Sequence, residues 1–224
     1  MFGSVFNILM WLIWFGSPAL SGAWLQEPGK TFTSLSATPR ISENGSYSDT
    51  ESTAYFERGA TAALTFGADL NAKGDGYGHA IAFLRRPLGP ADKQGRMAYQ
   101  LGFGARYQIS VWDPVIRLGL SLGRGINARS GFGWLTLDGT LEMGTSNGDA
   151  TAKLDATWGM PLANRLKTVV QIETTHWLDA ETSIAVTPSV LWEFRSESFL
   201  QLGVEARQSK TDTLGIKIGL WRNF

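Results

Sequence analysis

Apolar and polar side chains alternate one by one along most of the chain after residue 50. In the stretch 151–160, one face carries Ala152, Leu154, Ala156, Trp158 and Met160, and the residues between them are polar or glycine. The same period of two recurs in residues 54–70, 97–109, 116–123, 135–143, 182–194, 198–207 and 213–220. A period of two indicates β-strands with one apolar face, so the sequence predicts an all-β protein.

Turn-forming residues separate these runs at near-regular intervals. They lie at residues 73–76, 87–95, 112–114, 127–131, 146–149, 161–164, 179–180, 195–197 and 210–212. The runs between them are about 10 to 15 residues long. Strands of globular proteins average about five or six residues, whereas tilted membrane-spanning strands need about nine to eleven. Strand length therefore favours a transmembrane, antiparallel, up-and-down β-barrel over a soluble sandwich.

The chemistry of the two faces supports the same fold class. The non-apolar faces are rich in Gly, Ser and Thr and poor in Lys and Glu, which suits a crowded barrel interior. Aromatic residues gather near the predicted strand ends, as in interfacial girdles: Tyr107, Trp112, Trp134, Trp158, Trp177, Trp192, Trp221 and Phe224. A soluble lipocalin-like binding barrel is a second interpretation, and it requires a polar exterior.

The first 23 residues contain no Asp, Glu, Lys or Arg. The apolar run 5–15 is too short for a membrane-spanning helix, which needs about 20 residues, and it has the length of a signal-peptide core. Ser21 and Ala23 are small residues at the positions that signal peptidase reads. We therefore expect a signal peptide over 1–23, cleaved after Ala23, although it lacks the usual basic residue. A buried N-terminal helix is the alternative.

The final strand ends on an aromatic residue. Leu214, Ile216, Ile218 and Leu220 alternate before Phe224. This segment resembles the C-terminal insertion signal of bacterial outer-membrane β-barrels, except that Arg222 stands where an apolar or aromatic residue is usual. The resemblance implies export across the inner membrane and insertion into the outer membrane by the barrel-assembly machinery. It also implies contact with outer-membrane lipid and lipopolysaccharide.

The number of strands depends on the first 70 residues. The alternation runs unbroken from Ala54 to Leu70, so we expect one long strand there and ten strands in a barrel over 51–224. Residues 24–50 are then a polar lead-in, which is either a possible first strand or a lumen plug, with a turn-like segment at 42–49. If Glu57, Arg58 and Gly59 form a turn, the count becomes twelve, which is also even, as bacterial single-chain barrels require.

Charge and composition exclude several functions. Lys plus Arg and Asp plus Glu both number 20, so the net charge is zero and a nucleic-acid partner is disfavoured. The chain has no Cys, which excludes disulfides and thiolate metal sites. We find no pattern for a metal or cofactor, and we expect none.

Function in a barrel resides in its lumen or its surfaces. Charged residues whose phase points inward are six of each sign: Arg106, Arg117, Lys153, Lys167, Arg207 and Lys217, with Asp138, Glu142, Asp155, Glu173, Glu193 and Glu205. Buried charges need partners, so this balance predicts a largely filled lumen and a structural or interaction barrel. A narrow, passive porin-like channel for ions or small solutes is the alternative. A second alternative is a lipid-modifying enzyme that uses His79 or His176, although neither residue lies in a known motif.

Overall fold

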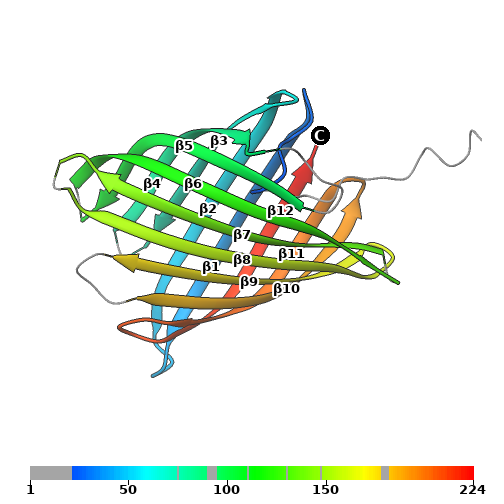
Figure 1. Ribbon diagram of the computed structural model, residues 1–224. Coiled ribbons are helices and arrows are strands. Elements are labelled where there is room, and N and C mark those ends of the chain that lie inside the picture. Colours follow the sequence, from blue (N-terminus) through cyan, green and yellow to red (C-terminus); the bar gives the residue numbers. More distant parts are fainter. Residues whose placement is uncertain are drawn as a thin grey trace, which may run out of the picture.

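The computed structural model describes residues 22–74, 76–89, 95–109, 111–129, 131–146, 148–177 and 182–224, which form twelve strands (Figure 1). The strands are β1 (Thr31–Ser42), β2 (Tyr47–Thr61), β3 (Leu64–Lys73), β4 (Tyr77–Pro87), β5 (Gly95–Gln108), β6 (Val111–Ala128), β7 (Gly131–Gly144), β8 (Ala150–Ala163), β9 (Leu166–Trp177), β10 (Ser183–Arg195), β11 (Ser198–Gln208) and β12 (Thr213–Asn223). Most of the predicted signal peptide, residues 1–21, lies outside the described residues, so its cleavage stays a prediction.

The twelve strands form one closed antiparallel barrel in which each strand pairs with its neighbours in sequence. The ring closes where β1 pairs with β12, with Leu35 opposite Leu220 and Ile41 opposite Leu214. The predicted all-β, up-and-down barrel is therefore confirmed. Within the described residues, no helix is long and apolar enough to cross a membrane.

The preferred count of ten strands is wrong, and the alternative of twelve is correct. The possible first strand exists as β1, so the barrel wall begins at Thr31 and not at residue 51. The second extra strand arises because residues 62 and 63 form a turn between β2 and β3, whereas Glu57, Arg58 and Gly59 lie within β2. A plain two-residue turn would reverse the odd–even phase of the chain, but the register shift between Gly59 and Thr61 adds one residue to β2 and restores it. The alternation therefore ran through this turn undetected.

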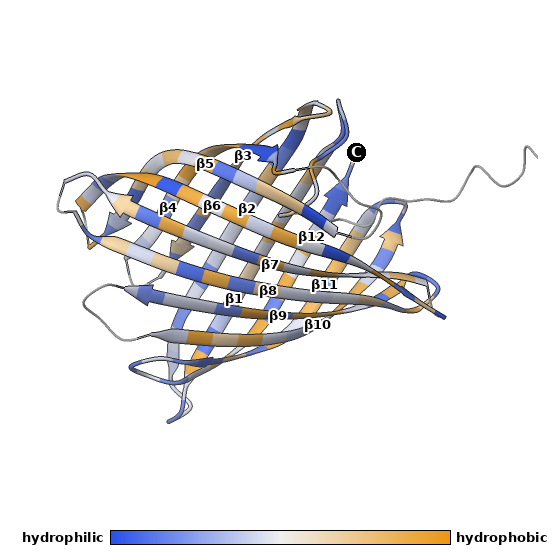
Figure 2. Cartoon of the chain, in the orientation of Figure 1, coloured by the Kyte–Doolittle hydropathy of each residue, from blue (hydrophilic) through white to orange (hydrophobic). Residues whose placement is uncertain are grey.

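The outer surface of the barrel is apolar and the inner surface is polar. Phe103 and Val204, on the outer face, are 67% and 58% exposed, whereas Glu57 and Thr187, on the inner face, are 0% exposed. Figure 2 shows the resulting alternation of hydrophobic and hydrophilic residues along the strands. This is the arrangement of a transmembrane barrel and the reverse of a soluble one, so the exterior does not fit the lipocalin-like interpretation.

Both ends of the barrel wall lie at the same mouth, which we call the termini side. There Thr31 and Phe224 exchange two backbone hydrogen bonds, with N···O distances of 2.7 and 2.9 Å. The connections β2–β3, β6–β7, β8–β9 and β10–β11 also lie on this side, and each is two residues long. The connections at the other mouth, the opposite side, are short as well, which limits the surface that loops present there.

Candidate functional site

The lumen is the candidate site, and its opposite-side half is crossed by ion pairs. Arg40 lies at the centre of the first network, which joins strands β1, β2 and β11. Its guanidinium donates to Glu205 with an Nε···Oε1 distance of 2.6 Å, and it also pairs with Glu51 and Asp49. Arg207 extends the network, because its Nη2 lies 3.6 Å from Glu51 and 3.5 Å from Glu173. Three of these six residues, Glu205, Arg207 and Glu173, belong to the inward-facing set predicted from the sequence.

Sequence reasoning missed the other three members of this network, Arg40, Asp49 and Glu51. They lie on β1 and β2, in or beside the segment that we expected to be a lead-in. Once β1 is recognised as a strand, Arg40 has the inward phase of Phe32 and Ser34, so this signal was present in the sequence.

A second network surrounds Arg117 on β6. Its guanidinium donates to Glu142 with Nε···Oε1 and Nη2···Oε1 distances of 3.0 and 2.7 Å, and to Asp69 at 2.5 Å. His79 joins it, with Nε2 lying 3.1 Å from Asp69 Oδ2 and 3.3 Å from Arg117 Nη2. Arg117 is 5% exposed and Glu142 is 4% exposed, so the pair is held away from the mouth.

Arg106 forms a smaller pair beside this network, with its Nη2 3.1 Å from Asp113 Oδ2. Asp113 was assigned to a turn by its Trp-Asp-Pro context, but it lies on β6 and faces inward.

A third network lies on the termini side and was not predicted. Arg85 on β4 donates to Glu57 with an Nη1···Oε2 distance of 2.6 Å, and to Tyr55 and Gln100 at 2.9 Å each. Glu57 also accepts from Gln26, which precedes β1, at 2.6 Å. Glu57 is 0% exposed and Arg85 is 4% exposed, so this is the most deeply buried ion pair among the described residues.

The remaining predicted residues of the lumen make looser contacts. Lys153 lies 4.0 Å from Asp155, and Lys217 lies 3.9 Å from Glu173 and 3.3 Å from the Gln171 side-chain oxygen. Lys153, Asp155, Gln171 and Glu173 border a cavity of about 240 Å³ that Asp138 also lines.

Two predicted residues lie near the termini-side mouth rather than at the cavity. Lys167 places its ammonium 4.6 Å from the centre of the Phe199 ring. Glu193 accepts a hydrogen bond from the backbone N–H of Glu197 at 3.1 Å.

An apolar cluster fills the lumen near the termini side. Its buried members are Phe32, Trp134, Val169, Leu191, Phe199 and Trp221, and Trp24 and Tyr55 pack against it. Trp134 and Trp221 are therefore lumen residues and not part of an outer girdle, whereas Trp112, Trp158, Trp177 and Trp192 are exposed as that prediction requires. The cluster draws on β1 and β7, which lie on opposite walls of the ring, so it reaches across the lumen.

Residues 22–30 run through the same region, and we call them the crossing segment. At one wall, Gly29 donates its N–H to the Gly59 carbonyl at 2.9 Å, and the Gln26 N–H donates to Thr65 Oγ1 at 3.0 Å. At the other wall, the Trp24 ring lies where a Cβ on Gly123 would be, so only glycine at 123 admits it. Gly22 lies against the Asp138 carboxylate. The segment thus passes from β2 and β3 to β6 and β7.

The residues of the predicted insertion signal lie on β12 and at its end. Leu214, Ile216, Ile218 and Leu220 face outward, with exposed fractions from 38 to 55%, and Phe224 is 55% exposed. The Arg222 guanidinium lies 5.1 Å from the centre of the Phe224 ring, which brings its charge to the termini-side edge. Their role in insertion stays a prediction.

The two histidines lie in different environments. His79 faces the lumen, where its Nε2 is held between a carboxylate and a guanidinium. His176 is exposed near the end of β9, and its Nδ1 lies 3.0 Å from Thr182 Oγ1. Within the described residues, no group of three or more His, Asp or Glu side chains is arranged to hold a metal ion.

Comparisons with known proteins show a shared fold without a shared sequence family. No protein-family model matches the chain, and no curated protein matches it. The NanC porin superposes with a TM-score of 0.61 over 84% of this chain and 98% of its own, at 7% sequence identity. The KdgM porin superposes with a TM-score of 0.56 over 85% of this chain and 99% of its own, at 8% identity. The resemblance to outer-membrane β-barrels is therefore confirmed at the level of the fold, and the chain has the fold of a transmembrane barrel of that class.

Proposed function

We propose that the protein is an integral barrel of the bacterial outer membrane whose lumen is closed, and that it serves as a structural or interaction barrel. The crossing segment carries this proposal, because it spans the termini-side half of the lumen from β2–β3 to β6–β7. The apolar outer surface and the fold shared with porins support the location.

Specific contacts hold the crossing segment in place. Gln26 uses both its backbone N–H and its side-chain amide, which donate to Thr65 at 3.0 Å and to Glu57 at 2.6 Å. Trp24 fills the space left by Gly123 and packs against the apolar cluster. The segment is held by hydrogen bonds at one wall and by a packed aromatic ring at the other. These contacts favour a fixed segment that closes the lumen over an unattached N-terminal tail.

The charge networks support a closed lumen on both sides, with those of Arg40 and Arg117 on the opposite side and that of Arg85 on the termini side. Arg40, Arg117 and Arg85 each contact at least one carboxylate within 2.7 Å, and each is 5% exposed or less. Charges buried away from water are stable only when they are paired, so the three ion pairs hold these side chains in fixed positions inside the barrel. Among the described residues, these networks leave no stretch of unpaired like charge that would attract a permeating ion.

A narrow porin-like channel is the second candidate. The cavity of about 240 Å³ favours it, because Lys153, Asp155 and Asp138 face this space and are weakly paired or without an ion-pair partner within 4 Å. The similar solved structures are also described as porins. In this function the crossing segment would have to leave the lumen before solute could pass.

Single-channel conductance in planar bilayers distinguishes the two candidates. We expect the folded chain to be silent and the double variant Trp24→Ala, Gln26→Ala to conduct in discrete steps, because both anchors of the crossing segment are removed. Tyr47→Ala is the matched control, since Tyr47 is exposed at the start of β2 on the opposite side. A heat-modifiable gel shift establishes that each variant is folded. Steps in the unmodified chain would refute the closed barrel and establish the porin-like function.

A lipid-modifying enzyme has less support. His79 Nε2 faces Asp69 and Arg117 rather than a hydroxyl group. His176 has one hydrogen-bond partner among the described residues, the Thr182 hydroxyl. Phospholipid cleavage by the folded protein that disappears in His79→Ala would establish this function instead.

A further inference from the structure

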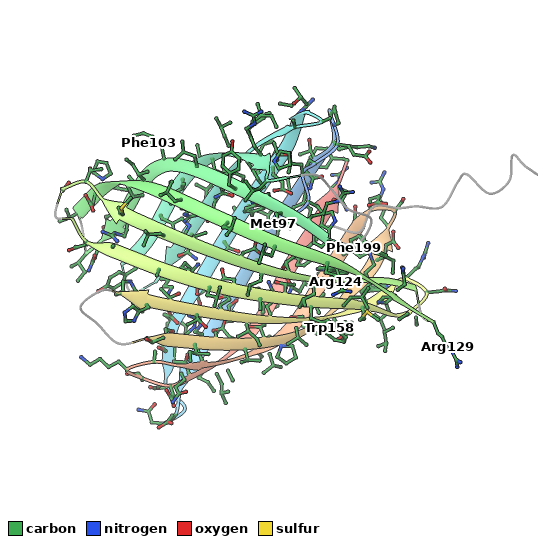
Figure 3. All side chains as sticks on the ribbon, viewed as in Figure 1. Met97, Phe103, Arg124, Arg129, Trp158 and Phe199 are labelled. Atoms are coloured by element: carbon green, nitrogen blue, oxygen red, sulfur yellow. The ribbon has the colours of Figure 1, made fainter. Side chains whose placement is uncertain are left out.

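An apolar groove lies on the outer wall over β5, β6 and β7, toward the termini side. It measures about 410 Å³ and is lined by Leu88, Gly89, Gly95, Arg96, Met97, Leu122, Gly123, Arg124, Leu135 and Leu137. Figure 3 shows Met97 and Arg124 on this wall, with Trp158 on the neighbouring surface. The groove is separate from the lumen, so its use is independent of whether the barrel conducts.

The strand register explains how the groove forms. Leu122 pairs with Met97 on one side and with Leu137 on the other, which makes an apolar floor. Arg124 pairs with Gly95 and Leu135 in the adjoining row. Since Gly95 has no side chain, the wall is hollow beside the Arg124 guanidinium.

Arg124 is a cation on a lipid-facing surface. It is exposed, and within the described residues it has no hydrogen-bond or ion-pair partner. Its row continues through Leu135 to Trp158, a residue type that marks the membrane–water interface. An arginine facing lipid costs about 2–4 kcal/mol at the bilayer midplane and about 0–1 kcal/mol near the interface, so this position suits a guanidinium that meets headgroups.

We propose that this groove binds one glycerophospholipid of the termini-side leaflet, with its phosphate on Arg124 and an acyl chain along Met97, Leu122 and Leu137. Charge complementarity selects the headgroup, because a planar guanidinium binds phosphate oxygens in a bidentate manner. An acyl chain suits the floor of the groove, because this floor is apolar and continuous with the apolar outer face of the barrel. A free phosphate ion would leave that floor uncovered.

Native mass spectrometry of the folded protein in detergent tests the proposal with added dioleoyl phosphatidylglycerol. We expect one retained lipid on the unmodified chain and about fivefold weaker binding in Arg124→Gln, since a basic residue near a lipid surface contributes about 1 kcal/mol. Arg129→Gln is the matched control, because Arg129 is an exposed arginine on the same side but outside the groove.

Leu137→Phe tests the acyl contact without making the exterior polar, and it should also weaken binding by filling the groove. Phosphatidylglycerol binding that is unchanged in both Arg124→Gln and Leu137→Phe overturns the proposal. Equal binding of dioleoylglycerol, which lacks the phosphate, overturns the assignment of the headgroup to Arg124. Displacement of the lipid by inorganic phosphate at equal concentration overturns the acyl contact.

Discussion

Replacing Glu57 with glutamine should expose how much the barrel depends on its most buried ion pair. The Glu57 carboxylate accepts from Arg85 at 2.6 Å, Tyr55 at 2.7 Å and Gln26 at 2.6 Å. Glu57→Gln keeps the volume but removes the charge, so the Arg85 guanidinium stays buried beside the neutral oxygens of Tyr55, Gln100 and the new amide. Removing one partner of a buried pair costs about 3–5 kcal/mol, and we expect a loss of unfolding free energy in that range.

Glu173→Gln is the internal control. Its carboxylate is 27% exposed, and its nearest cations lie 3.5 Å away at Arg207 and 3.9 Å away at Lys217. Because water screens such a pair, its loss should cost less than about 1 kcal/mol. The contrast between the two variants isolates burial as the cause, since both replace a lumen glutamate with glutamine.

The double variant Glu57→Gln, Arg85→Met completes a thermodynamic cycle. Removing both charges leaves no unpaired ion, so the double variant should be at least about 1 kcal/mol more stable than Glu57→Gln alone. Urea unfolding in lipid vesicles, followed by tryptophan fluorescence, gives each free energy by linear extrapolation. Equal costs for Glu57→Gln and Glu173→Gln, or additive costs in the double variant, would refute the reasoning.

Two further changes test the insertion signal and the crossing segment. Deleting Phe224 should reduce the amount of heat-modifiable barrel in the membrane fraction several-fold, because it removes the end of the signal and the two backbone bonds with Thr31. Tyr47→Ala, which changes an exposed aromatic side chain and leaves the backbone of β2 intact, is the comparison. Unchanged insertion without Phe224 would contradict its role. Gly123→Val should displace the Trp24 ring and produce conductance steps in planar bilayers. Gly139→Val should not, because an added Cβ at this position on β7 meets no atom closer than 3.9 Å. Silence from folded Gly123→Val would show that Trp24 is not needed for closure.

The sequence predicts the fold because period-two alternation reports directly which face of each strand meets lipid. The alternation is a reliable guide from β5 to β12, where outward positions hold large apolar side chains such as Leu118 and Ile216. It is weak at β1, whose outward face includes Thr33 and Pro39 beside Leu35 and Ile41, so contrast between the faces is low. The turn at 62–63 then hid a strand boundary, because the register shift between Gly59 and Thr61 keeps β2 and β3 in the same odd–even phase.

The charged lumen residues were predictable wherever apolar neighbours fixed the phase. Arg117 and Glu142 have leucine or isoleucine neighbours on both sides or nearby, so their inward direction follows from the pattern. Arg85 and Arg86 are adjacent and equally polar, so hydropathy cannot tell which of them faces inward. Only the strand pairing shows that Arg85 is buried with Glu57 while Arg86 is exposed.

The crossing segment could not be predicted, because its meaning depends on contacts between distant parts of the chain. In the sequence, Gly123 looks like any other glycine of a strand. The structure shows that the ring of Trp24, 99 positions earlier, occupies the space where a side chain at 123 would lie.

The fold also places a physical constraint on the predicted cleavage site. Ala23 is 2% exposed inside the barrel, so a protease could reach the bond after it only before the wall closes. If cleavage occurs there, it precedes barrel closure and removes Gly22 and Ala23, so the part of the crossing segment that stays in the lumen begins at Trp24.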